Sequence, residues 1–130
     1  MSVWTWVGLA EALAIHEVQL AQHGGGIGIR DLGLLESALA RPQNLHAYQT
    51  ADVHTLAAAY TAGILQNHPF VDGNKRTGFI VGVLFLELNG HLFFAEEAEA
   101  AQAVLELAAG DLDEEAYQRW LQHVSRRTET

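Results

Sequence analysis

Fold and function both depend on one uninterrupted stretch, His68-Pro69-Phe70-Val71-Asp72-Gly73-Asn74-Lys75-Arg76-Thr77. Proline lacks an N–H group, and glycine and asparagine both accept left-handed backbone angles, so Pro69 and Gly73-Asn74 predict an irregular turn. A long apolar segment begins at Thr77. Where a turn leads into a helix, the first backbone N–H groups lack partners and bind anions. The stretch therefore predicts an anion site at the start of the following segment.

The charges of this stretch favour phosphate as the anion. Lys75 and Arg76 would lie in the first helical turn, where the helix dipole disfavours cations, so a negative ligand is expected beside them. The N–H groups around Gly73, Asn74 and Lys75 would cradle the phosphate, since glycine lets the backbone approach closely. Both cations would offset charge that develops on a transferred group, with Arg76 able to offer two donors at once.

Two further residues complete a possible reaction site. Asp72 is placed to hold a Mg²⁺ that bridges phosphates, which is how this ion is usually bound. His68 lies at the lip of the cradle, and an imidazole can take a proton from an attacking hydroxyl at neutral pH. Together the residues indicate transfer of a phosphorus-centred group onto an alcohol. The structural alternative is a hydrogen-bonded turn of His68, Asp72 and Arg76 that locks two helices together.

Composition limits the other possibilities. The chain has 130 residues, no cysteine and a net charge of −9. This length fits one domain over residues 1–130, and the lack of cysteine excludes disulfides and thiolate metal sites and fits a cytoplasmic protein. The acidic balance argues against a nucleic-acid partner bound through a broad basic face. We find no signal peptide, and the longest apolar run, Gly78–Leu86, is too short to span a membrane.

The first half of the chain predicts three helices. Residues 8–23 form an amphipathic pattern with Leu9, Leu13 and Leu20 on one face. His16-Glu17 begins like a zinc-protease helix, but Leu20 replaces the second histidine, so a packing or capping role is expected for His16. A glycine-rich flexible connector follows, and then a helix from Asp31 to Arg41. The last of the three, capped by Thr50 or Asp52, would end at Asn67 before Pro69.

Several later segments are less uniform in pattern. Pro42–Ala51 is polar and aperiodic, which predicts a loop, either an ordinary one or one that holds a partner. Phe79–Leu88 fits either a strand that leads through Asn89-Gly90 into a hairpin or a buried helix that stops there, and the pattern alone leaves both open. Beyond it, a helix starts at Glu96-Glu97 with Ala101, Val104, Leu105 and Ala108 on its inner face. A last helix follows Asp113, with Tyr117, Trp120, Leu121 and Val124 inward, and residues 125–130 are expected to form a flexible tail.

The motif resembles that of a known family. His68 to Arg76 matches every position of the Fic/Doc core motif, HPFx(D/E)GN(G/K)R. Further similarity to the short Doc ("death on curing") branch lies in Ile15-His16-Glu17, Gly28-Ile29-Arg30-Asp31 and Phe85-Leu86-Glu87-Leu88-Asn89-Gly90. The resemblance covers roughly residues 8 to 125.

The resemblance implies an all-α fold, a compact bundle around a central buried helix over Phe79–Leu88. It implies that Pro42–Ala51 is a flap that positions the target beside the active site. It also assigns roles: His68 is the base, Asp72 the metal ligand, and Phe70 a buried anchor. Gly73, Asn74, Lys75 and Arg76 become the phosphate cradle.

The Doc branch implies a particular activity. The chain departs from adenylyl-transferring Fic proteins at two positions. These proteins have glycine at the position of Lys75 and a second arginine at the position of Phe79. Doc differs from them at the same two positions. Doc-like proteins transfer the terminal phosphate of ATP, with Mg²⁺, to a threonine of elongation factor Tu and arrest translation. The chain also lacks the Ser/Thr-x-x-x-Glu-Gly/Asn inhibitory motif, which implies a toxin restrained in trans by a separate antitoxin. The alternatives are an adenylyltransferase, because Pro69 and Gly73 are the general Fic choices, and a silent binding module.

Overall fold

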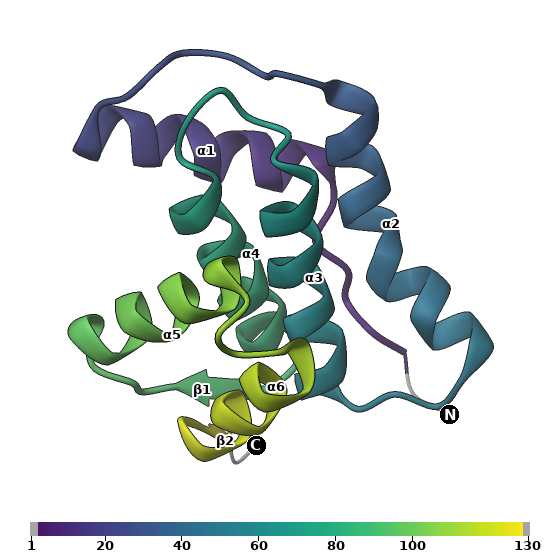
Figure 1. Cartoon of the computed structure of the whole chain (residues 1–130). Helices are drawn as coiled ribbons and strands as arrows, with labels where there is room; N and C mark the ends of the chain where they lie inside the picture. Colours follow the sequence, from purple (N-terminus) through teal and green to yellow (C-terminus); the bar gives the residue numbers. More distant parts are fainter. Residues whose placement is uncertain (1–2, 129–130) are drawn as a thin grey trace.

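The computed structural model describes residues 3–128, which fold into six helices and one two-stranded sheet (Figure 1). In chain order the elements are α1 (Leu9–His23), α2 (Leu32–Tyr48), α3 (Val53–Asn67), α4 (Asn74–Leu88), β1 (His91–Phe93), α5 (Glu97–Ala109), α6 (Glu114–His123) and β2 (Ser125–Arg127). This confirms the all-α prediction and the helical reading of Phe79–Leu88. In this described part no helix combines the length and apolar character needed to cross a membrane.

The central buried helix is α3, where nearly every side chain from Val53 to Ile64 is buried. It contacts α2, α4, α5 and α6, and its alanines allow their close approach. The resemblance put the central helix at Phe79–Leu88, but α4 buries only one face there and leaves Val83 and Leu84 half-buried. Gly82 sets the contact between the two helices, because a Cβ there would lie 3.0 Å from the Ala57 carbonyl oxygen.

The loop and flap predicted over Pro42–Ala51 are wrong for most of that segment. Helix α2 continues through Pro42 to Tyr48, and only the residues from Gln49 to Asp52 separate it from α3. A proline inside a helix removes one hydrogen bond to the residue four positions earlier, here Ala38. The Ala38 carbonyl faces Gly63 of α3, and the Pro42 ring is buried. Packing against α3 thus outweighs the local preference for a break.

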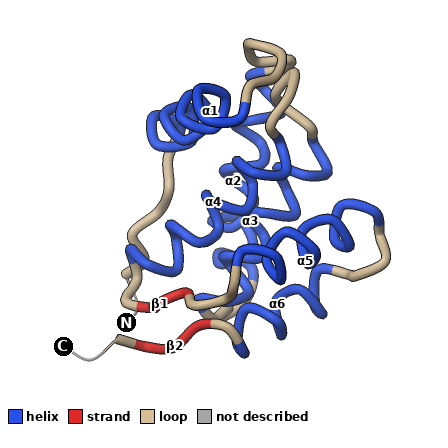
Figure 2. The backbone as a smooth tube through the Cα atoms, turned by 90° about the vertical axis from the view of Figure 1, so that its left-hand side faces the viewer, coloured by secondary structure: helices blue, strands red, loops and turns tan. Residues whose placement is uncertain are grey.

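The C-terminal prediction also needs correction. Ser125–Arg127 is not a flexible tail but strand β2, which pairs antiparallel with β1 and places Phe93 opposite Ser125 (Figure 2). His91–Phe93 does form a strand, but its partner strand lies more than thirty residues away in the sequence and not across a hairpin turn at Asn89-Gly90. Residues 129–130 of the expected tail lie outside the described residues.

Two helices turn a different face inward than their patterns predicted. In α1 the buried side chains are Ala12, His16 and Gln19, while Leu9, Leu13 and Leu20 are half-buried. In α5 the core receives Ala100, Ala103 and Val104, so the predicted inner face is correct only for Val104. Ala101, Leu105 and Ala108 are exposed, and Leu105 keeps 51% of its surface in solvent. For α6 the predicted stripe and the Asp113 cap are confirmed.

A buried tyrosine attaches the N-terminal segment to α3. The Tyr60 hydroxyl donates to the Val7 carbonyl oxygen at 3.0 Å and accepts from the Val7 N–H at 2.9 Å. Burial raises the pKa of Tyr60 to about 12. The neutral form is thus favoured in the fold, and this stabilisation is complete below about pH 10 and is lost as the pH rises toward 12.

We predict that Tyr60→Phe lowers the free energy of unfolding by about 1–3 kcal/mol, because both Val7 backbone groups lose a buried partner. Urea denaturation measures the change. Tyr48→Phe is the matched control, since Tyr48 is 90% exposed and should change stability little. Equal stabilities for the two variants would contradict this account.

Candidate active site

The predicted turn lies between α3 and α4 and begins in an unusual backbone conformation. His68 caps the C-terminus of α3 with φ 49° and ψ 54°, in the left-handed region. Among the described residues it is the only one other than glycine with a positive φ. The chain then reverses through Pro69 and Phe70, which are buried, so that α4 can start at Asn74. Phe70 is fully buried and is thus the anchor that was expected.

The Asn74 side chain closes this turn from inside. Its Oδ1 accepts from the Phe70 N–H at 3.0 Å, and its Nδ2 donates to the Phe70 carbonyl oxygen at 3.0 Å. Asn74 is only 4% exposed, so both bonds are shielded from water. The side chain expected in the phosphate cradle is therefore engaged by the protein itself, which leaves the Asn74 backbone N–H for a ligand.

Helix α1 supports the turn through His16. The imidazole stacks on the Phe70 ring, with centroids 3.8 Å apart and planes 10° apart. Its Nε2 lies 2.9 Å from the Asp72 carbonyl oxygen, an acceptor, which assigns the proton to Nε2. The packing role predicted for His16 is confirmed. Sequence reasoning missed its partner, which lies 56 positions away.

The glycine-rich segment after α1 is not a free connector but lies along the turn. The Val71 N–H donates to the Gly28 carbonyl oxygen at 3.1 Å, and Ile29 forms a bridge with Phe70. Gly25 has φ 124°, and a Cβ there would lie 2.7 Å from the Asp72 Oδ2. Glycine is therefore required at Gly25 for backbone angle and for space, a signal that the run of glycines carried in the sequence.

The Asp72 carboxylate stands exposed at this junction. Hydrogen bonds from the N–H groups of Gly73 (2.8 Å) and Gly26 (3.3 Å) lower its pKa, and the charge of Arg76 adds to the effect. It is therefore ionised at neutral pH. Groups of three or more potential metal ligands do not occur in residues 3–128. A Mg²⁺ bound with phosphates needs only one or two carboxylates besides water and phosphate oxygens, so an exposed, ionised Asp72 fits such an ion.

Helix α4 presents a bare N-terminus. Gly73, the N-cap residue, has φ 82°, and no side chain in the described part of the chain caps this end. The first turn of α4 also has no acidic residue. Lys75 and Arg76 are both exposed there. Unpaired N–H groups, the positive end of the helix dipole and two cations thus coincide, which is the arrangement that binds an anion.

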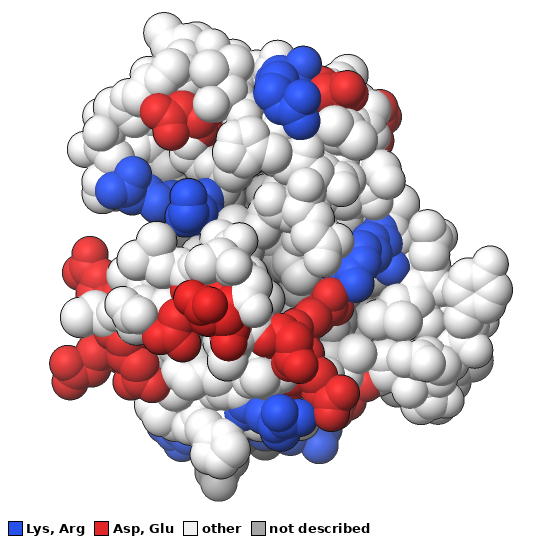
Figure 3. All heavy atoms as spheres, viewed as in Figure 1, with Lys and Arg blue, Asp and Glu red and all other residues white. Residues whose placement is uncertain are grey.

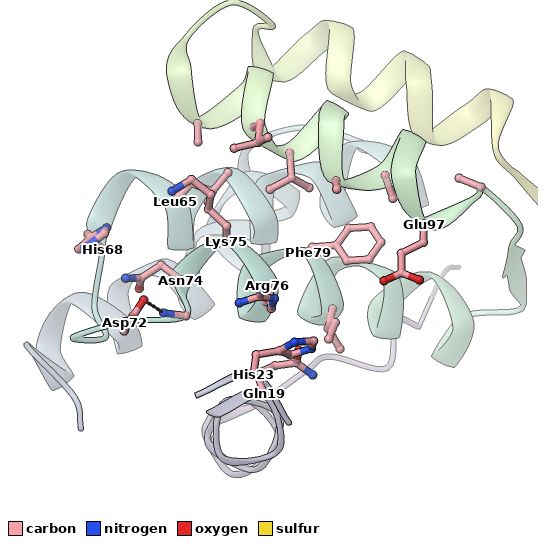
Figure 4. A pocket seen from close by; sticks show the side chains of 18 of the residues that line it. Gln19, His23, Leu65, His68, Asp72, Asn74, Lys75, Arg76, Phe79 and Glu97 are labelled. Atoms are coloured by element: carbon pink, nitrogen blue, oxygen red, sulfur yellow. Dashed lines mark hydrogen bonds between the residues drawn. The ribbon is translucent and has the colours of Figure 1, made fainter. Parts of the chain in front are cut away.

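All six predicted site residues border one pocket of about 800 Å³ (Figure 4). Beyond the turn the pocket has an apolar wall formed by Leu65 of α3, Phe79 of α4, and Val104 and Leu105 of α5. It also has polar positions at Gln19, His23 and Glu97. Figure 3 shows acidic side chains gathered on this face of the molecule, whereas the cations of the site come from the start of α4. The pocket thus has a cationic end and an apolar extension that the sequence did not predict.

These features define a small helical domain with an uncapped helix N-terminus, a carboxylate and a histidine at one pocket. The chain belongs to the Fic/DOC family, whose sequence profile matches residues 6–86. It is 32% identical over 103 residues to "Protein kinase doc" of Escherichia phage P1, covering 78% of this chain and 81% of that protein. It is 38% identical over 96 residues to "Toxin Doc" of Mycolicibacterium smegmatis, covering 69% and 72% respectively. These matches support a toxin of this family with transferase-type chemistry.

We predict that Asn74→Ala lowers the free energy of unfolding by about 1–3 kcal/mol, because the buried N–H and carbonyl of Phe70 lose their partners. Thermal or urea denaturation measures the loss. Asn44→Ala, at an exposed position of α2, is the matched control and should be nearly neutral. A stable Asn74→Ala variant would show that the turn does not depend on this amide.

Proposed function

We propose that the protein is a toxin that transfers the terminal phosphate of ATP to a threonine or serine hydroxyl of a target protein. The observation that carries the proposal is that His68, Asp72 and the uncapped N-terminus of α4 open into the same pocket. We propose elongation factor Tu as the target, following the Doc-like motif, so that modification arrests translation. Because ATP and this target are cytoplasmic, we propose that the toxin acts in the cytoplasm.

In this proposal the start of α4 holds the phosphate. The backbone N–H groups of Asn74, Lys75 and Arg76 point along the helix axis toward the ligand, and the left-handed Gly73 keeps the approach open. The two cationic side chains offset the charge of the transferred group. Asp72 would hold a Mg²⁺, which supplies neutralisation of charge on the phosphate oxygens when bound.

His68 acts as the general base. The target hydroxyl oxygen forms a bond to the terminal phosphorus as the bond from that phosphorus to the bridging oxygen breaks, and ADP leaves with that oxygen. The hydroxyl proton passes to the imidazole, which is exposed at the pocket lip. The reaction thus requires His68 to be neutral and correctly placed before transfer.

Restraint by an antitoxin in trans belongs to the same proposal. The apolar positions of the helices between Leu9 and Arg41 offer it little surface, because most of them pack against the core, including Leu35 and Leu39. The α5 part of the apolar pocket wall, where Leu105 is half-exposed, is a more accessible docking site for an apolar partner segment. Its neighbours Glu97 and Glu106 favour a segment that also carries Lys or Arg.

We predict that His68→Ala reduces group transfer by about 10²–10⁴-fold, the usual contribution of a general base, while the protein stays folded. The assay incubates the protein with ATP, Mg²⁺ and a translation extract and weighs the modified protein by mass spectrometry. His123→Ala, at an exposed position of α6, is the control and should keep full activity. The gain of one phosphate supports the proposal. The gain of a nucleoside monophosphate would identify an adenylyltransferase instead, and no modification by the wild type would contradict both.

We further predict that Asp72→Asn weakens Mg²⁺-dependent ATP binding and leaves the melting temperature nearly unchanged. Asp72 is exposed, and the asparagine Oδ1 can still accept from the Gly73 N–H. Calorimetric titration with and without Mg²⁺ measures the effect. Asp111→Asn removes the same charge from an exposed loop and should bind ATP as the wild type does. Unaltered Mg²⁺ dependence in Asp72→Asn would place the metal ligand elsewhere.

A further inference from the structure

The backbone of His68 needs an external support. A left-handed conformation is disfavoured for a residue with a Cβ, and persists only where the surroundings impose it. At a helix C-terminus this position is usually glycine. In the proposed function, position 68 needs an imidazole as the general base, so glycine cannot take this position.

Arg30, from the segment before α2, provides that support. Its Nε donates to the His68 carbonyl oxygen at 2.7 Å and its Nη2 to the Asn67 carbonyl oxygen at 2.8 Å. These carbonyls lie at the C-terminal end of α3, where no N–H group of the helix is available to donate to them. The adjacent N–H groups of Arg30 and Asp31 donate to the Pro69 carbonyl oxygen at 2.7 and 3.0 Å. One short segment thus fixes three consecutive carbonyls around His68.

The contacts suit an arginine in particular. The guanidinium is planar and offers two donors in a fixed fork, so it can hold two neighbouring carbonyls at once, whereas a lysine ammonium is a single point on a flexible stem. Its charge also complements the negative end of the α3 dipole. Arg30 does not line the pocket, and it lies at the surface rather than in the core.

We propose that Arg30 is a positioning residue for the reaction: its fork holds His68 in the left-handed conformation that presents the imidazole to the pocket. It acts through His68 and touches neither ATP nor the target. This inference rests on the proposed function, because it assigns His68 the role of base. The competing explanation is that Arg30 only caps α3 and contributes to stability.

The test compares Arg30→Lys and Arg30→Ala with Arg41→Lys. Arg41 is a matched control, since its guanidinium also forks, to the Ala59 carbonyl oxygen (3.1 Å) and Glu114 (2.6 Å), and it does not line the pocket. We expect both Arg30 variants to lose about 10²-fold in kcat, the usual effect of a small misplacement, with the KM for ATP unchanged. Arg41→Lys should retain kcat. Millimolar guanidinium chloride should partly restore kcat in Arg30→Ala and not in His68→Ala.

A second measurement is independent of activity. The φ angle of His68, from three-bond couplings in isotopically labelled protein, should be positive in the wild type and Arg41→Lys and should change in Arg30→Lys. If the wild type transfers no group, the proposed function fails, while this measurement still decides whether Arg30 fixes His68. The inference would be overturned if Arg30→Lys kept the kcat of the wild type. It would also be overturned if Arg30→Lys lost kcat while the φ angle of His68 stayed unchanged.

Discussion

Two hydrogen bonds between the Asn74 amide and the Phe70 backbone are the constraint on which the site depends. They close the turn from within and fix where α4 begins, so they fix the direction of its free N–H groups. Because Phe70 is buried and stacked on His16, the turn cannot shift without opening its contact with α1. Asn74, which the sequence pattern places in the phosphate cradle, thus shapes the predicted site through its side chain.

The turn also brings together two helix ends of opposite polarity. The C-terminus of α3 presents carbonyls, and the guanidinium of Arg30 satisfies the last of them. The N-terminus of α4 presents N–H groups, and no side chain among residues 3–128 caps it, so this helix end offers favourable electrostatics to an anion. This asymmetry explains why cations stand at the start of α4 although the helix dipole disfavours them there. In the proposed function, the base stands on one helix end and the anion site on the other, as phosphoryl transfer to a hydroxyl requires.

Local chemistry explains what could be predicted from the sequence. Asp52 and Asp113 cap helices as expected, Pro69 ends α3, and the turn at Gly73 opens α4, because each effect is decided within a few residues. The wrong predictions all concern segments whose structure depends on contacts with residues far away in the sequence. Pro42 stays helical because α3 packs against it, β2 forms because β1 lies beside it, and the glycine-rich segment is ordered by a turn 46 residues away. The exposed face of α5 was assigned to the core because an apolar pocket wall and a core stripe have the same periodicity. The six predicted site residues border one pocket because they fall within the short stretch 68–76. His16 and Arg30 contact backbone atoms of this stretch from distant positions, which no local pattern reveals.

The central claim is that the start of α4 is an anion site directly beside His68. Amide resonances followed by NMR while ATP and Mg²⁺ are added test it most directly. The account predicts that the largest and saturable shifts fall on the N–H groups of Asn74, Lys75 and Arg76, with the His68 imidazole also affected. Shifts confined to other helices, or no saturable change at Asn74–Arg76, would contradict it.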